Sequence, residues 1–180
     1  MEHGDHVRLI RDGVSGSGPR WLEIGAGSGA FTLALADLLG PAGKVVAVDR
    51  DGSALATLSS RLPPIAVETL VADFTRPLPL EPGSFDGLLA ANALHFHPDP
   101  ATVLADLRSL LLAGGRLVIV EYDTDQGNPY VPYPFSFLSL APILSRAGFG
   151  PPRLVGRVPS RFLGAIYGAV SEPLEVPPVV

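Results

Sequence analysis

Short apolar runs alternate with amphipathic stretches through the first two thirds of the chain. Side chains alternate with a period of two in a strand and about 3.6 in a helix, so the apolar runs are typical of buried strands and the amphipathic stretches of helices. Strands separated by helices favour an α/β fold with a doubly wound, parallel sheet. Five strands are predicted in this part of the chain, at 20–24, 45–48, 65–71, 85–91 and 116–122.

Proline and glycine mark the ends of the predicted helices. Pro63 and Pro64 end the helix that precedes them because proline lacks an N–H donor, and Gly114 and Gly115 end the helix before the fifth strand. Helices are predicted at 30–39, about 53–61 and about 99–112, with a short one at the N-terminus over 3–14.

The last third of the chain has a different character. A polar, proline-bearing and aromatic loop over 123–134 precedes a predicted helix over 135–147 that is broken at Pro142. Two further strands are predicted at 153–158 and 162–170.

The tight turn Pro159-Ser160 joins these two strands and makes them antiparallel. The prediction is therefore a doubly wound, Rossmann-like sheet of seven strands, mostly parallel with an antiparallel C-terminal hairpin. We expect residues 1–170 to form a single domain with one hydrophobic core, and residues 171–180 to form a loose C-terminal tail.

Composition excludes several classes of protein. Of the 180 residues, 47% are hydrophobic and 17% are charged, so the chain can bury a core and is not intrinsically disordered. It contains no cysteine, which excludes disulfides and thiol nucleophiles and fits a reducing cytoplasm. A net charge of −5 argues against a nucleic-acid partner. No apolar run approaches the roughly 18 to 20 residues that cross a membrane, and the N-terminus does not resemble a signal peptide.

A glycine-rich turn, Glu23 to Ala30, joins the first predicted strand to its helix. It places three alternate glycines after an acid, and such glycines let a ligand approach a helix N-terminus without meeting a Cβ. Two cofactor classes use this arrangement. Gly25, Gly27 and Ala30 also satisfy the dinucleotide fingerprint, and Asp49 lies 24 residues beyond Gly25.

Further residues, taken in order, match one family. The run Glu23-x-Gly25-x-Gly27-x-Gly29 resembles the first motif of the class I S-adenosylmethionine-dependent methyltransferases. Asp49 resembles the acid that binds the ribose hydroxyls in both cofactor classes. Ala72-Asp73-Phe74 resembles the segment that holds the adenine ring, with Asp73 accepting from its exocyclic amine. The segment from Ala91 to Phe96 resembles the small-molecule branch, similar to ubiquinone and menaquinone biosynthesis methyltransferases.

The resemblance implies a cytoplasmic, bacterial methyltransferase that uses S-adenosylmethionine and acts on a small molecule at oxygen, nitrogen or carbon. Methyl transfer requires no metal, and none is predicted. The residues that the resemblance assigns to cofactor binding are Glu23, Gly25, Ala26, Gly27, Gly29, Asp49, Arg50, Asp73, Phe74 and Asn92.

The methyl acceptor is expected above the carboxyl ends of the fourth and fifth strands, walled by the N-terminal segment and the loop after the fifth strand. This loop contains Tyr130, Tyr133, Phe135 and Phe137, and such an aromatic wall suits a flat or apolar acceptor. Tyr130 and Tyr133 are predicted to bind the substrate, together with His6 from the N-terminal helix.

The histidines fall in two pairs. His3 and His6 are three residues apart, share a helix face and could point together into the cleft. His95 is predicted to line the methionine end of the cofactor and to take a proton from the acceptor, whereas His97 is expected to cap the next helix. A metal site is disfavoured because no carboxylate completes a familiar ligand spacing.

Two other functions stay open at this point. A nicotinamide-dependent oxidoreductase fits the glycine turn, but a short-chain reductase needs a lysine four residues after a tyrosine, and the single lysine, Lys44, lies at the start of the second strand. A non-catalytic S-adenosylmethionine-binding protein is the other. The short N-terminal segment also leaves three forms of the cleft: open, closed by the helix over 3–14, or completed by a second subunit in a homodimer.

Overall fold

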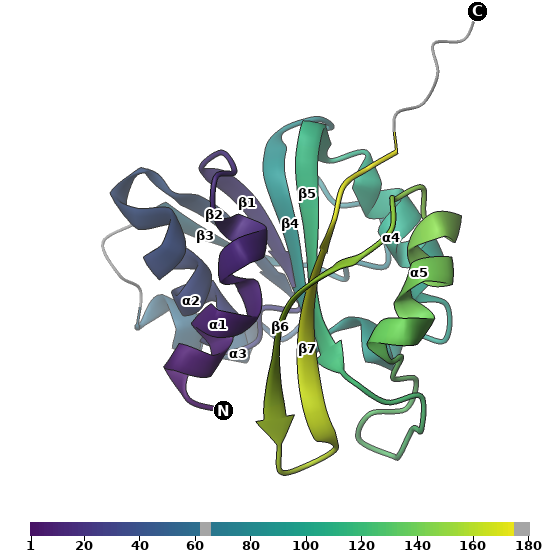
Figure 1. The fold of residues 1–180 in the computed structure, drawn as a ribbon. Helices are drawn as coiled ribbons and strands as arrows, with labels where there is room; N and C mark the ends of the chain where they lie inside the picture. Colours follow the sequence, from purple (N-terminus) through teal and green to yellow (C-terminus); the bar gives the residue numbers. More distant parts are fainter. Residues whose placement is uncertain (62–65, 175–180) are drawn as a thin grey trace, which may run out of the picture.

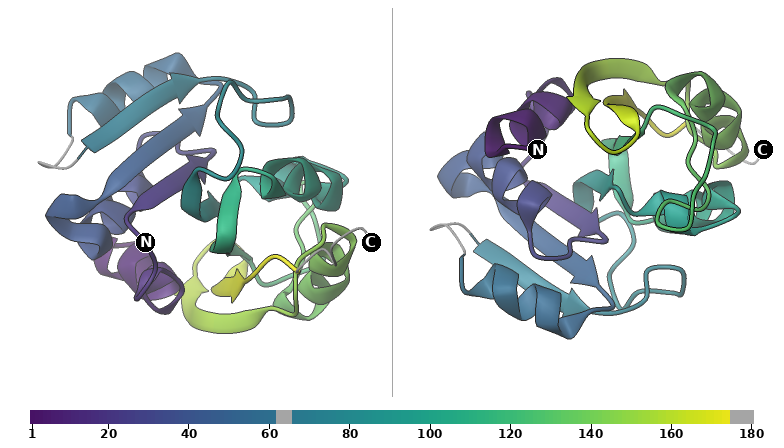
Figure 2. Two further views of the ribbon diagram at one scale, coloured as in Figure 1. Left: turned by 90° about the horizontal axis from the view of Figure 1, so that it is seen from above. Right: turned by 90° about the horizontal axis from the view of Figure 1, so that it is seen from below.

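A sheet of seven strands lies between two layers of helices (Figure 1, Figure 2) in the computed structural model, which describes residues 1–61 and 66–174. The strand order is β3-β2-β1-β4-β5-β7-β6, and only β7 is antiparallel to its neighbours β5 and β6. The predicted fold class is therefore confirmed. The strands are β1 (Arg20–Ile24), β2 (Lys44–Asp49), β3 (Ala66–Val71), β4 (Phe85–Ala91), β5 (Leu111–Tyr122), β6 (Arg153–Ser160) and β7 (Gly164–Ser171).

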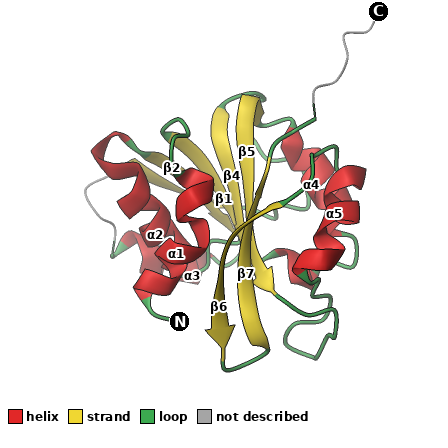
Figure 3. Cartoon of the chain, in the orientation of Figure 1, coloured by secondary structure: helices red, strands yellow, loops and turns green. Residues whose placement is uncertain are grey.

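The helices cover both faces of the sheet (Figure 3). The first three lie on one face, and α4 and α5 lie on the other. The described helices are α1 (His3–Val14), α2 (Ala30–Leu39), α3 (Gly52–Ser59), α4 (Pro100–Arg108) and α5 (Phe137–Arg146), with the 3-10 turns η1 (Gly40–Ala42) and η2 (Leu94–Phe96).

The sheet divides the apolar interior into separate clusters. One cluster packs α4 and α5 against the sheet, a second packs α1 and α2 against the opposite face, and a smaller third lies under α3. The prediction of one core was wrong, because a sheet covered on both faces buries apolar side chains on each of them.

The N-terminal helix α1 lies on a face of the sheet. Its residues Leu9, Ile10 and Val14 are buried against β5, β6 and β7. A Cβ at Gly168 would collide with the carbonyl oxygen of Leu9, so glycine in β7 allows this close approach. The helix thus uses its apolar side to cover the sheet.

The segment before β5 differs from the prediction. Helix α4 ends at Arg108 instead of 112, and β5 begins at Leu111 and continues through the two glycines expected to end the helix. The reason is a pairing that periodicity does not reveal: the carbonyl of Leu110 accepts from Phe85 N, and Leu111 pairs with Phe85 in β4.

The turn of the C-terminal hairpin also lies elsewhere than predicted. Pro159 and Ser160 belong to β6, where Pro159 pairs with Ala165, and the turn consists of the three residues 161–163. Proline is tolerated because β6 is an edge strand of the sheet. The Ser160 hydroxyl accepts from Phe162 N and so stabilises the displaced turn.

Other boundaries need smaller corrections. Helix α3 ends at Ser59, and α5 begins at Phe137, after its N-cap Ser136, and continues through Pro142. No helix joins β3 to β4 in residues 72–84, and no helix was predicted in this segment. The predicted start of the third strand at residue 65 and the two prolines before it lie outside the described residues.

The boundary of the C-terminal tail was placed too early. Ser171 ends β7, Glu172 accepts a backbone hydrogen bond from Gly150, and Leu174 N donates to Gly148 O. Residues 175–180 lie outside the described part of the chain. The described tail is therefore bound to the loop after α5.

Candidate functional site

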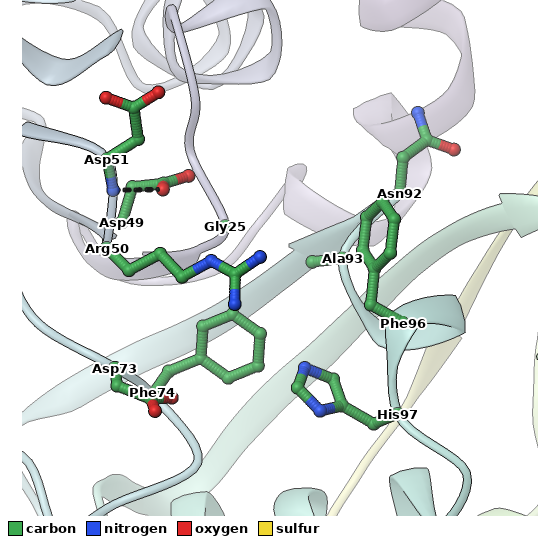
Figure 4. Close-up of a pocket in the computed structure, with 10 residues that line it drawn as sticks. All are labelled: Gly25, Asp49, Arg50, Asp51, Asp73, Phe74, Asn92, Ala93, Phe96 and His97. Carbon is green, nitrogen blue, oxygen red and sulfur yellow. Dashed lines mark hydrogen bonds between the residues drawn. The ribbon is translucent and has the colours of Figure 1, made fainter. Parts of the chain in front are cut away.

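A cavity of about 460 Å³ lies at the carboxyl ends of β1, β2, β3 and β4. The connections that leave β1 and β4 run to opposite faces of the sheet, and ligands of such sheets bind in the crevice between them. The side chains come from four separate segments (Figure 4). The lining residues are Gly25, Asp49, Arg50, Asp51, Asp73, Phe74, Asn92, Ala93, Phe96 and His97.

Six of the predicted cofactor-binding residues line this cavity, and four do not. Those in the lining are Gly25, Asp49, Arg50, Asp73, Phe74 and Asn92. In Figure 4 the guanidinium group of Arg50 extends toward the middle of the cavity-lining residues, between Asp49 and His97. The other four, Glu23, Ala26, Gly27 and Gly29, lie on or beside the glycine turn behind it.

The glycine turn needs glycine for two different reasons. Gly25 has a φ of +68°, and a Cβ there would lie 2.5 Å from Ala93 Cβ, so glycine allows the loops after β1 and β4 to meet. At Gly29, which has a φ of +88°, a Cβ would collide with Leu58 of α3, so packing also requires glycine at this position. Ala26 is buried, and its N–H donates to Val48 O.

Asp49 connects the glycine turn to the start of α3. Its Oδ2 accepts from Gly27 N at 2.8 Å, and its Oδ1 accepts from Asp51 N at 2.9 Å, the bond dashed in Figure 4. Each carboxylate oxygen keeps a further lone pair, so the fixed carboxylate can still accept from ligand hydroxyls.

Asp73, Phe74 and His97 form the opposite wall. Asp73 Oδ1 accepts from Thr75 Oγ1 at 2.7 Å and from Thr75 N at 3.0 Å. Both hydrogen bonds lower the pKa of Asp73, and the one from the Thr75 hydroxyl has the larger effect. The Phe74 and His97 rings meet edge to face at 5.2 Å. Burial lowers the pKa of His97, which favours the neutral form of the ring.

His97 is a residue whose place the sequence did not predict. It lines the cavity, whereas the N-cap of the following helix is Asp99. The expectation that His97 caps α4 was therefore wrong. The available signal was its position directly after the turn that follows β4, on the same edge as Phe74.

Two buried polar groups near the cavity lack partners among the described residues. One of them is Glu23 Oε2. Burial raises the pKa of Glu23 to about 8; the Thr32 side chain opposes this rise, and the charge of Asp49 adds to it. Asn92 Oδ1 is the other, on a residue with a φ of +51°. Unpaired buried polar atoms and left-handed backbone gather where a ligand completes the site. The lining thus fits a cofactor that carries an amine, hydroxyls and an aromatic ring.

His95 lies beside the cavity, not in its lining. Its ring is buried, with 3% of the residue exposed, and Nδ1 is 2.7 Å from Oε2 of Glu121 at the end of β5. The ring contacts Phe96, a cavity residue, at 4.3 Å and Tyr122 at 5.8 Å between centroids. Glu121 was missed by the sequence reasoning, although an acid at the end of the apolar run before Tyr122 was a visible signal.

An aromatic surface that shares Phe96 with the cavity lining continues from His95. We define it by Phe96, Tyr122, Tyr130 and Phe162. The Tyr122 and Phe162 rings are 5.9 Å apart, the Tyr130 and Phe162 rings are 6.2 Å apart, and Tyr130 and Phe162 are 76% and 51% exposed. Phe162, from the turn between β6 and β7, was not predicted.

The loop aromatics have divided roles. Tyr133 is exposed, and its N–H donates to the carbonyl of His95 at 2.9 Å. Phe135 is buried in the core, and Phe137 packs its ring edge against Tyr167 at 5.7 Å. Two of the four expected wall residues are therefore part of the interior.

The two N-terminal histidines diverge. His3 Nε2 lies 2.7 Å from Asp37 Oδ2, while His6 packs edge to face on Phe31 at 4.7 Å. The expectation that they point together into the cleft was wrong, because each contacts α2 and neither lines the cavity. Within residues 1–61 and 66–174, no group of three or more histidines and carboxylates could hold a metal ion. No described helix is long and apolar enough to span a membrane.

Solved structures of other proteins superpose on the sheet and helices of this chain. The YcgJ protein of Bacillus subtilis superposes with a TM-score of 0.76 at 13% identity, covering 97% of this chain and 100% of that one. An S-adenosylmethionine-dependent methyltransferase of Aquifex aeolicus superposes with a TM-score of 0.66 at 23% identity, covering 86% and 84%. These similarities show the fold.

Relatives found by sequence include bacterial methyltransferases named for menaquinone and ubiquinone biosynthesis. A demethylmenaquinone methyltransferase of Lactococcus lactis is 32% identical over 102 residues, 56% of this chain and 40% of the relative. A ubiquinone/menaquinone biosynthesis C-methyltransferase of Ectopseudomonas mendocina is 33% identical over 133 residues, 69% of this chain and 51% of the relative. The chain spans about half the length of these relatives or less.

The family described as "Methyltransferase domain" matches residues 22–119, more than half of the chain. The match contains the glycine turn, Asp49, Asp73 and the turn after β4, which are the segments that build the cavity. It decides against the nicotinamide-dependent oxidoreductase. The chain therefore belongs to the methyltransferase-domain family, among the class I methyltransferases whose cofactor is S-adenosylmethionine.

Proposed function

We propose that this protein transfers the methyl group of S-adenosylmethionine to a small-molecule acceptor at oxygen, nitrogen or carbon. The observation that carries this proposal is the cavity at the carboxyl edge of the sheet, with a buried histidine–carboxylate pair and an aromatic surface directly beside it. S-adenosylmethionine supplies an electrophilic methyl group when it is bound. Every other requirement, binding, orientation and removal of a proton, falls to residues of this chain.

Residues around the cavity would hold the cofactor in three parts. Asp49 would accept from the ribose hydroxyls, since its carboxylate is fixed by two backbone N–H groups. Asp73 would accept from the adenine amine beside the flat wall of Phe74 and His97. Asn92, whose buried Oδ1 has no partner among the described residues, would accept from the ammonium group.

The remaining predicted residues would act through the glycine turn. Glu23 has a buried oxygen without a described partner, behind the turn that Ala26, Gly27 and Gly29 form. The turn and Arg50 complete the predicted set of cofactor contacts.

Residues beside the cavity would orient the methyl acceptor. Displacement of a methyl group needs the nucleophile held in line and water kept out, which an apolar wall provides. The aromatic surface, with Tyr130 at its outer end, suits a flat or apolar molecule. Tyr133 and His6 stay predicted substrate contacts. His95, between Phe96 and Tyr122, would take the proton that the acceptor loses.

The setting of the protein is part of the proposal. The quinone methyltransferases among the relatives support a small-molecule acceptor. The net charge of −5 supports the absence of a nucleic-acid partner, and the lack of cysteine supports a cytoplasmic location. The bacterial organisms of the relatives support a bacterial source. The cavity lining includes no residue of α1, so an open cleft or a homodimer is favoured over closure by this helix.

Calorimetry with S-adenosylhomocysteine, followed by turnover of methyl-labelled S-adenosylmethionine in a bacterial metabolite extract, tests the proposal. We expect binding and label in a small-molecule product. Binding without any labelled product would favour the non-catalytic cofactor-binding protein. A rise in melting temperature with NADH, but none with S-adenosylhomocysteine, would contradict the cofactor assignment.

A further inference from the structure

Glu121 is a fully buried carboxylate whose two oxygens are both used by the segment after β4. Its Oε1 accepts from Leu94 N at 3.0 Å and from His95 N at 3.3 Å. Its Oε2 lies 2.7 Å from His95 Nδ1, and the side chain is 0% exposed. Three nitrogen atoms of one short turn thus converge on one carboxylate from the neighbouring strand.

Support of the backbone alone does not account for this residue. Two N–H groups at the start of η2 need an acceptor, and the amide oxygen of a glutamine would provide one. A buried carboxylate has a large desolvation cost, which is offset when several donors surround it. The feature that a neutral amide would not reproduce is an acceptor at Oε2 facing the imidazole.

The carboxylate determines which ring nitrogen of His95 carries the proton. An ionised carboxylate only accepts hydrogen bonds, so Nδ1 must donate, and in the neutral ring Nε2 is then left with its lone pair. The other titratable groups near the ring are Tyr122, whose pKa burial raises, and His97 on the following segment. Tyr167 is near Glu121, and burial raises the pKa of Tyr167 well above its ordinary value, so this side chain is neutral.

The ring of His95 lies where a proton acceptor is useful. On one side it contacts Phe96, which lines the cavity, and on the other it contacts Tyr122 of the aromatic surface. A base at this position lies between the two groups of residues that would hold the methyl donor and the methyl acceptor.

We propose that Glu121 is a positioning residue that holds His95 in its Nδ1–H tautomer, so that Nε2 receives the proton of the methyl acceptor. This rests on the proposed function. As the acceptor atom forms its bond to the methyl carbon, the carbon–sulfur bond breaks with its electron pair on sulfur, and the acceptor's proton moves to Nε2. The resulting imidazolium donates from Nδ1 to the Glu121 carboxylate.

Long-range proton–nitrogen NMR of protein labelled with ¹⁵N-histidine tests the tautomer without any substrate. The sequence has four histidines, so the His95→Asn variant suffices to assign the signals of His95. We expect a protonated Nδ1 and an unprotonated Nε2 at mildly alkaline pH. A protonated Nε2 with an unprotonated Nδ1 in the unaltered protein would overturn the proposal, since Glu121 would then be the donor.

The Glu121→Gln variant gives the second arm. Its amide oxygen can still accept from Leu94 N and His95 N, but its NH₂ group then faces Nδ1, which must become an acceptor. We expect the proton to move to Nε2. The matched control Glu172→Gln, which changes an exposed glutamate beside Arg116, should leave the His95 signals in place. A Glu121→Gln spectrum with the original tautomer would overturn the proposal even if the variant is less stable.

Turnover of labelled S-adenosylmethionine separates this inference from the proposed function. We expect Glu121→Gln to lower turnover about 100-fold or more while the affinity for S-adenosylhomocysteine stays within about twofold. An equal effect of Glu172→Gln and Glu121→Gln on turnover would overturn the positioning role. Absence of turnover in the unaltered protein, with the expected tautomer present, would instead count against the proposed function.

Discussion

The cavity and the aromatic surface are neighbours built in different ways. The residues that line the cavity each lie at or shortly after the carboxyl end of β1, β2, β3 or β4, so each is close in sequence to a strand that positions it. The aromatic surface combines η2, the end of β5, the following loop and the turn between β6 and β7. Its members Phe96 and Phe162 are 66 residues apart in the chain.

The difference teaches which contacts follow from local sequence. The carboxyl ends of parallel strands meet at one edge of a sheet, so motifs after consecutive strands gather without further information. The aromatic surface depends on the antiparallel pairing of β7 with β5, in which Tyr122 pairs with Ile166. This register places the turn that carries Phe162 next to Tyr122.

The largest effect is expected at the junction of the two regions. His95→Ala removes the proposed base and should lower turnover about 100- to 10,000-fold, with the affinity for S-adenosylhomocysteine nearly unchanged. His97→Ala is the matched comparison: because His97 lines the cavity, it should weaken cofactor binding. Calorimetry and labelled turnover measure both quantities. Equal losses of affinity and turnover in His95→Ala would make the histidine part of the cofactor site and erase the boundary between the regions.

On the cavity side, Glu23→Gln should change how stability depends on pH. The pKa of Glu23 is raised in the folded protein from its ordinary 4.5 to about 8, so the folded state binds the proton more tightly. The contribution of Glu23 to the free energy of unfolding is then greatest below about pH 4.5 and falls as the pH rises toward 8, by on the order of a few kcal/mol. Glutamine does not titrate and should remove this fall.

Denaturant unfolding at pH 5 and pH 8 checks the expectation for Glu23, with the exposed Glu68→Gln in β3 as control. The difference in unfolding free energy between Glu23→Gln and the unaltered protein should grow at pH 8. If the unfolding free energies of Glu23→Gln and the unaltered protein change with pH in parallel, the folded protein does not raise the pKa of Glu23 and the expectation is wrong.

A smaller effect is expected on cofactor affinity from Asp49→Ala. Loss of a charged acceptor for the ribose hydroxyls should weaken S-adenosylhomocysteine binding by about 1.5 to 3 kcal/mol. Asp86→Asn is the control, because Asp86 also accepts a backbone N–H, from Arg20, but at the opposite edge of the sheet. If calorimetry gives the same affinity for Asp49→Ala and the unaltered protein, the ribose assignment is wrong.

The smallest effect is expected on the aromatic surface. Phe162→Ala removes ring contacts to Tyr122 and Tyr130 and should raise the KM for the acceptor by a factor equivalent to about 0.5 to 1.5 kcal/mol. Cofactor affinity should not change. Leu138→Ala, which removes an exposed apolar side chain on α5, is the control. A weaker affinity for S-adenosylhomocysteine in Phe162→Ala would extend the cofactor site across both regions.

Helix ends and turns show where sequence reasoning was weaker. The helix predicted to end at Gly114 and Gly115 stops at Arg108, because the backbone after it pairs with Phe85 of β4. The turn expected at Pro159-Ser160 moves because Pro159 can occupy an edge strand. The helix end is decided by a strand more distant in the chain, and the turn by the edge position of β6 in the sheet.

The sequence by itself determined the alternation of strands and helices, the glycine turn, and the positions of Asp49, Asp73 and Asn92 at strand ends, because periodicity and turn chemistry act within a few residues. Only the tertiary structure decided that Glu121 faces His95, that His97 enters the cavity and that Phe162 joins the aromatic surface. These contacts depend on strand order and on register across β4, β5 and β7. Register is set by the packing of whole faces of the sheet, and a local stretch of sequence does not contain it.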